Sequence, residues 1–79
     1  MKLGEVVRLI PKNVEFFVEV YKASDETDMI YAYWIGPFND KERDDLNTQL
    51  DREVIEIRPC TGTRDRRPAL SIAIRDERY

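Results

Sequence analysis

Few side chains in this sequence can do covalent or metal chemistry. The 79 residues contain no histidine and a single cysteine, Cys60. Cysteine and histidine are the usual protein ligands of zinc, and histidine is the general base of most nucleophilic triads. The composition therefore removes most zinc sites and triad arrangements, and we predict a protein without a metal or another cofactor.

The one catalytic spacing that deserves a test is formed by Cys60 and Arg66, which stand in the pattern C-x5-R after an expected strand. A thiolate there would attack phosphorus, while the arginine and backbone N–H groups held the phosphate oxygens. This spacing is similar to that of cysteine-dependent phosphatases, which have a histidine before the cysteine and a helix beginning near the arginine. Here Pro59 precedes the cysteine and Pro68 leads into an expected strand. We therefore predict that the chain is not an enzyme and keep phosphatase-like chemistry by Cys60 and Arg66 as an alternative.

The same segment, residues 58–67, is a basic patch in an acidic chain. The sequence has 16 acidic and 13 basic residues, a net charge of −3. Four arginines surround the single Asp65 of this segment, namely Arg58, Arg64, Arg66 and Arg67. Guanidinium groups bind phosphates and carboxylates well. Nucleic-acid binding through this arginine loop is a second alternative, although the overall negative charge favours a protein partner.

Aromatic side chains gather on two expected strands: Phe17, Tyr21, Tyr31, Tyr33 and Trp34. Such rings belong either to the core or, on an open sheet face, to a base-stacking platform or a protein-binding hot spot. Glu15 and Glu19 would share the face of Phe17 and Tyr21 and would repel a phosphate backbone. We therefore predict a protein-binding or self-associating domain of accessory or inhibitor type. Its expected contacts are Arg58, Arg64, Arg66, Arg67, Tyr21, Tyr33 and Trp34.

The elements that must position these residues follow from the apolar patterns. Strands are expected over 5–10, 14–22 and 29–35, which are rich in β-branched and aromatic residues and are separated by turn clusters. In the second of them the face that carries Val18 and Val20 should point into the core. Both faces of segment 29–35 are apolar, which is typical of a central strand covered on both sides.

The second half of the chain predicts one helix and two more strands. Asn39 to Glu42 has the side chains of a capping box, and a helix over 40–51 would carry only Leu46 and Leu50 as its apolar stripe. Strands are expected over 54–58 and 69–74, joined by the long connection 60–68. The resulting order, β-β-β-α-β-β, predicts an α+β fold with a five-stranded, mainly antiparallel sheet and one helix.

Length limits the architecture to one small domain, residues 1–79, with a thin core that a second copy could complete. The longest apolar run, 31–38, is far shorter than the roughly 20 residues of a membrane helix. The first residues show no signal-peptide pattern, and a lone cysteine forms no internal disulfide. We expect a cytoplasmic protein that makes no contact with a membrane.

Overall fold

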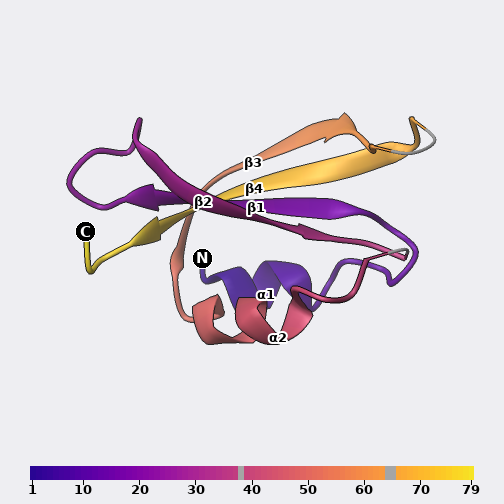
Figure 1. Cartoon of the computed structure of the whole chain (residues 1–79), viewed down its shortest axis with the longest axis horizontal. Helices are drawn as coiled ribbons and strands as arrows, with labels where there is room; N and C mark the ends of the chain where they lie inside the picture. Colours follow the sequence, from indigo (N-terminus) through magenta and orange to yellow (C-terminus); the bar gives the residue numbers. More distant parts are fainter. Residues whose placement is uncertain (38, 64–65) are drawn as a thin grey trace.

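A single sheet with both helices on one of its sides is the architecture of this chain (Figure 1). The computed structural model describes residues 1–37, 39–63 and 66–79. In chain order its elements are α1 (Leu3–Val7), β1 (Phe16–Lys22), β2 (Met29–Ile35), α2 (Arg43–Leu46), the 3₁₀ turn η1 (Asn47–Gln49), β3 (Glu53–Thr61) and β4 (Pro68–Asp76).

The strand order across the sheet is β2-β1-β4-β3. β2 runs antiparallel to β1 and β3 antiparallel to β4, while the central strands β1 and β4 are parallel. The α+β class is therefore confirmed, but the expected detail is wrong. Within the described residues the sheet is mixed and has four strands instead of five, and two short helices and a 3₁₀ turn replace the one expected helix.

Segment 5–10, expected to be a strand, is occupied instead by the helix α1 and the turn that follows it. Leu3, Val6, Val7 and Ile10 recur at helical spacing, and all four contact the core. The β-branched valines suggested a strand, but burial of this stripe outweighs their weak intrinsic preference. Glu5 also supports the helix start, because its carboxylate accepts a hydrogen bond of 3.1 Å from the backbone N–H of Lys2.

The helix expected over 40–51 is broken into α2 and η1. Leu46 is buried, and one turn further along Leu50 packs against the edge of the core. Between these two leucines the inward position is taken by the polar Gln49, which is buried as well. Two leucines and a glutamine cannot hold a long amphipathic helix against the sheet, so only short helical turns form.

The core lies between the helices and one face of the sheet. The phenylalanine and valines of β1 that were expected to face inward, Phe16, Val18 and Val20, are buried there, which confirms that prediction. The aliphatic residues of β4 share this face, because Leu70 and Ile72 stand beside Phe16 and Val18 in the parallel register. The small residues of β4, Ala69, Ser71 and Ala73, alternate with them and point to the opposite face.

β2 is an edge strand of the sheet, so the expected central position of segment 29–35 is wrong. Its Tyr31, Tyr33 and Ile35 pair with core residues of β1, whereas Ala32 and Trp34 lie on the opposite face of the sheet. In the described parts of the chain no helix covers that opposite face (Figure 1). We call it the open face.

The β3–β4 connection is shorter than the expected 60–68. β3 continues through Pro59 to Thr61, and the backbone N–H of Gly62 donates to the carbonyl of Arg67 at 2.8 Å. A proline is accommodated in a strand when the strand is at the sheet edge and the proline nitrogen faces away from the neighbouring strand. Because β3 is an edge strand, it continues through Pro59 to Thr61, and the expected strand end at this proline is wrong.

Candidate protein-binding surface

The open face consists of side chains in rows that cross the four strands. One row contains Trp34, Phe17, Ser71 and Arg58, and the next contains Ala32, Glu19, Ala73 and Glu56. A third row contains Met29, Tyr21, Arg75 and Glu53. The half of the open face formed by β1 and β2 is therefore mostly aromatic and apolar, and the half formed by β3 and β4 is small and charged.

The aromatic residues grouped in the sequence divide between the two faces of the sheet. Phe17, Tyr21 and Trp34 lie on the open face and are partly exposed. Tyr31 and Tyr33 pack against the core, with ring centroids 5.2 Å apart in an edge-to-face arrangement. Burial raises the pKa of Tyr33 to about 12. Of the predicted contact residues, Tyr33 therefore lies away from Tyr21 and Trp34, on the helix side.

Met29 belongs to the aromatic half of the open face, although the pattern of segment 29–35 did not predict this. A strict alternation would place Met29 with Tyr31, on the core side. A register shift lets Val20 pair with Tyr31 and the next residue, Tyr21, pair with Met29. This irregularity turns the exposed methionine toward the open face, and bulges of this kind leave no clear signal in a single sequence.

Trp34 is held in place by three neighbours. Its indole Nε1 donates to a carboxylate oxygen of Glu15. Its backbone N–H donates to Glu42 Oε2 at 2.8 Å, and its carbonyl accepts from Asn39 Nδ2 at 2.8 Å. Glu15 therefore holds the indole ring, while Glu42 and Asn39 hold the backbone that carries it. A ring held in this way is already ordered in the unbound protein.

Glu15, which directly precedes β1, and Glu19, within β1, both accept hydrogen bonds from neighbouring segments of the chain. Glu15 also accepts hydrogen bonds from the backbone N–H and the hydroxyl of Thr63, at 2.9 and 2.8 Å. Glu19 accepts from Ser71 Oγ at 3.0 Å and is 3.4 Å from Arg58 Nη2. The predicted presence of both carboxylates beside the aromatic rings is confirmed, and they give this face negative charge close to the rings.

The predicted arginines do not form one cluster on this face. Arg58 lies in the row of Trp34 and Phe17. Arg66 and Arg67 are exposed beyond the ends of β3 and β4, and Arg66 adopts a left-handed backbone with φ of 58°. Arg64 lies outside the described residues. Of the three predicted arginines that the structure describes, the sheet brings Arg58 into register with the aromatic rings.

Cys60 is poorly placed for nucleophilic attack on a phosphate. It is a half-buried strand residue opposite Ala69. The amide of Gly62 is used in the hairpin, and the amide of Thr63 already binds the carboxylate of Glu15. Burial raises the pKa of the Cys60 thiol, the Glu15 and Glu19 carboxylates raise it further, and Arg58 only partly opposes them. A thiol in these surroundings is protonated at neutral pH.

We expect Cys60 to react slowly with iodoacetamide at pH 7.5. In the folded protein the labelling rate should be at least about tenfold below that of the same chain in concentrated urea. Burial limits access to the sulfur, and the raised pKa lowers the fraction of Cys60 that is present as thiolate. Mass spectrometry of timed samples measures both rates, and a Cys60→Ser variant corrects for labelling at other residues. A folded rate equal to or above the urea rate would contradict this placement of the thiol.

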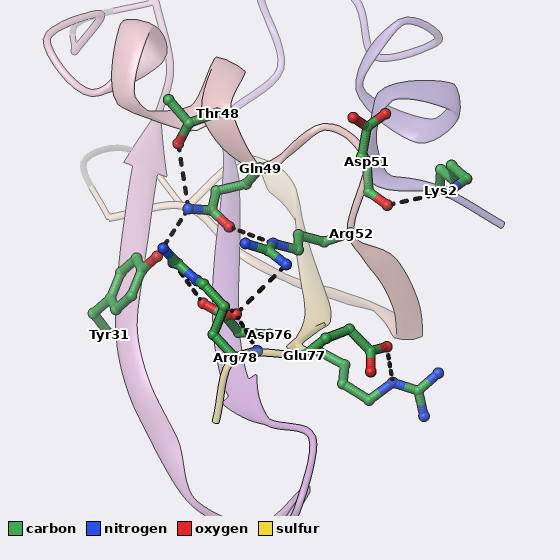
Figure 2. Close-up of polar contacts among 10 residues, drawn as sticks. Lys2, Tyr31, Thr48, Gln49, Asp51, Arg52, Asp76, Glu77 and Arg78 are labelled. Carbon is green, nitrogen blue, oxygen red and sulfur yellow. Dashed lines mark hydrogen bonds and ion pairs between the residues drawn. The ribbon is translucent and has the colours of Figure 1, made fainter.

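A polar cluster centred on Asp76 lies at the end of β4, close to η1, β2 and the start of β3 (Figure 2). Asp76 is fully buried and forms a bidentate ion pair with Arg78, with N–O distances of 2.9 and 3.1 Å. Arg52 Nη1 lies 3.5 Å from the same carboxylate, and Arg52 Nε donates to Gln49 Oε1 at 3.2 Å. Gln49 in turn donates to the hydroxyl of Tyr31 at 3.0 Å.

The Asp76 cluster is suited to holding elements together. The hydrogen bonds from Arg78 lower the pKa of Asp76 to about 2, with a further contribution from Arg52. The carboxylate is therefore ionised and paired throughout the neutral range, so it is a poor proton donor or acceptor. Within residues 1–37, 39–63 and 66–79, no group of three or more cysteines or acidic residues is arranged to hold a metal ion.

No family model, curated protein or solved structure matches the chain. Its function is therefore inferred from the geometry described above. In the described portions of the chain, no helix is long and apolar enough to cross a membrane.

Proposed function

We propose that this chain is a non-enzymatic protein-binding domain that contacts its partner with the aromatic half of the open face. The observation that carries the proposal is the row of Trp34 and Phe17, with Tyr21 and Met29 beside it, on a sheet face that no described helix covers. Tyrosine and tryptophan are the residue types most enriched where binding energy concentrates. Charged and small side chains of β3 and β4 form the rim.

Preorganisation supports this role. An interface residue that is already fixed loses little conformational entropy on binding. Trp34 is fixed by Glu15, Glu42 and Asn39, so its ring is presented in one orientation. Arg58 stands at the far end of the same row, where a guanidinium group can pair with a carboxylate of the partner.

The charge of the open face favours a protein over a nucleic acid. Glu15 and Glu19 lie among the aromatic rings, and a phosphate backbone that approached these rings would be repelled by both carboxylates. Arg66 and Arg67 lie beyond the ends of β3 and β4, outside these rows. Partners with basic or apolar surfaces meet no such repulsion.

Affinity capture with three tagged forms of the chain tests the proposal. The parent, Tyr21→Ala and Tyr79→Ala are used, because Tyr79 is an exposed tyrosine outside the sheet and serves as a matched control. We expect a protein that binds the parent and Tyr79→Ala with the same Kd, and that binds Tyr21→Ala about tenfold or more weakly. Thermal unfolding verifies that each variant is folded.

Two results would contradict the proposal. One is a partner whose affinity is unchanged in Tyr21→Ala and in a second variant, Trp34→Ala, that is shown to be folded. The other is recovery of nucleic acid in place of protein, with binding that weakens steeply as salt is raised.

A further inference from the structure

We infer that the free edge of β3 is a self-association surface that pairs antiparallel with β3 of a second copy, with Ile57 on the twofold axis. This inference goes beyond the proposed function, because it concerns the free edge of β3 in place of the aromatic half of the open face and commits to one occupant. Arg58 belongs to both surfaces, so the dimer is measured with the purified chain alone. The pairing would join two four-stranded sheets into one continuous sheet.

The backbone groups of β3 alternate between β4 and the free edge. The hydrogen bond from Gly62 N–H to the carbonyl of Arg67 shows that Gly62 faces β4. Alternation then turns Cys60 and Arg58 toward β4 and turns Ile57 and Pro59 toward the edge. An independent contact agrees, because Leu70, the partner of Pro59, directs its N–H to Glu15 on the β1 side.

The available edge is short. The beginning of β3 is covered by the first residues of the chain, since Val54 N–H donates to the carbonyl of Met1 at 2.8 Å and Lys2 bridges to Glu53. Pro59 has no N–H to donate. Ile57 is therefore the residue near the middle of the edge that offers both an N–H and a carbonyl to another strand.

A twofold axis at Ile57 is the register that satisfies both hydrogen bonding and charge. It pairs each Ile57 with its symmetry mate through two reciprocal hydrogen bonds, and it places Glu56 of each copy opposite Arg58 of the other. A shift of the axis by one residue would place like charges opposite each other, Glu56 against Glu56 or Arg58 against Arg58. A shift to Pro59 would remove both central hydrogen bonds.

The helix side of the same edge supplies apolar surface. Ile57 is 42% exposed and Leu9 is 78% exposed. Both line an open groove of about 390 Å³ between the α1 region and the sheet, together with Met1 and Leu70. In the proposed dimer the two Ile57 side chains meet beside the two grooves, so the pairing would remove exposed apolar area from water as well as form hydrogen bonds.

A charge-swap series tests this register. Glu56 and Arg58 are both more than half exposed, so we expect the charge-swap variants to fold. We expect a dimer for the parent chain in sedimentation equilibrium, and a dissociation constant raised at least about tenfold in Glu56→Arg and in Arg58→Glu. The double variant Glu56→Arg/Arg58→Glu restores opposite charges across the axis and is expected to recover most of the dimer.

Two outcomes would overturn the inference. One is a parent chain that remains monomeric up to millimolar concentration. The other is a double variant that dimerises no better than the single variants, because any register without Glu56 opposite Arg58 gives no such rescue. Circular dichroism verifies the fold of each variant. Tyr21→Ala does not alter this edge, so loss of the dimer and loss of an outside partner are separate results.

Discussion

Replacing Asp76 by asparagine is expected to lower the free energy of unfolding by about 3 kcal/mol at pH 7, a large part of the stability of a domain this small. The side chain is fully buried and is paired with Arg78 and Arg52. An asparagine has nearly the same shape but no charge, so the variant leaves Arg52, which is mostly buried, without its counter-ion.

The effect of this substitution should depend on pH. The pKa of Asp76 falls from an ordinary 3.8 to about 2 in the folded protein. A carboxyl whose pKa is lower in the folded than in the unfolded chain stabilises the fold above the unfolded pKa, and this stabilisation is lost as pH falls through the folded pKa. The difference corresponds to roughly 2.5 kcal/mol, which should disappear between about pH 5 and pH 2.

Urea unfolding of the parent and Asp76→Asn at several pH values between 7 and 2.5 measures the loss of stability at pH 7 and its dependence on pH. Asp28→Asn is the matched control, because Asp28 pairs with Lys22 at 3.0 Å on the surface, where an ion pair contributes at most about 1 kcal/mol. The two variants should differ strongly at pH 7 and become similar near pH 2.5. An Asp76→Asn deficit that stays constant over this range would contradict the role assigned to the buried carboxylate.

The second large effect is expected for Leu3→Ala, which should destabilise the fold by about 2 to 5 kcal/mol. Leu3 is fully buried in the core cluster, whereas Leu9, six residues later, is 78% exposed. Leu9→Ala should therefore change stability by less than about 0.5 kcal/mol. Chemical denaturation at low protein concentration gives both values without a contribution from self-association.

This pair of leucines also distinguishes helix from strand in the first ten residues. A strand would place Leu3 and Leu9 on the same face, because they are an even number of residues apart. In the structure Leu3 packs from α1 into the core together with Val6, and Leu9 is exposed in the turn after the helix. Similar losses of stability for the two alanine variants would therefore argue against α1.

The strands β1 and β4 could be predicted because the alternation of side chains that marks a strand is visible within a few consecutive residues. In β1 the valines alternate with Phe17, Glu19 and Tyr21, and this period of two predicted that the face of Val18 and Val20 is buried, as the structure has it. In β4 large aliphatic residues alternate with small ones, which predicted a strand there. The same rule placed Glu15 and Glu19 beside the rings of the open face. The scarcity of histidine and cysteine likewise limited the chemistry before any fold was known.

The remaining features depend on which segments meet. The spacing of Leu3, Val6, Val7 and Ile10 fits a helix, but β-branched residues at those positions fit a strand as well, and only the available sheet face decides between the two. Both faces of β2 are apolar, yet β2 lies at an edge, because it pairs with β1 on one side and no described strand pairs with its other side. The parallel pairing of β1 with β4 joins segments about fifty residues apart, which no local period encodes.

The sequence by itself determined a small α+β domain, the buried face of β1 and the acidic residues that accompany the aromatic rings. The tertiary structure alone decided that Tyr21 and Trp34 share an uncovered face while Tyr33 does not, that β3 presents Ile57 at a free edge, and that Asp76 is a buried anion held by two arginines. The physical reason is that alternation and composition are properties of neighbouring residues, whereas exposure, register and ion pairing are set by contacts between distant ones.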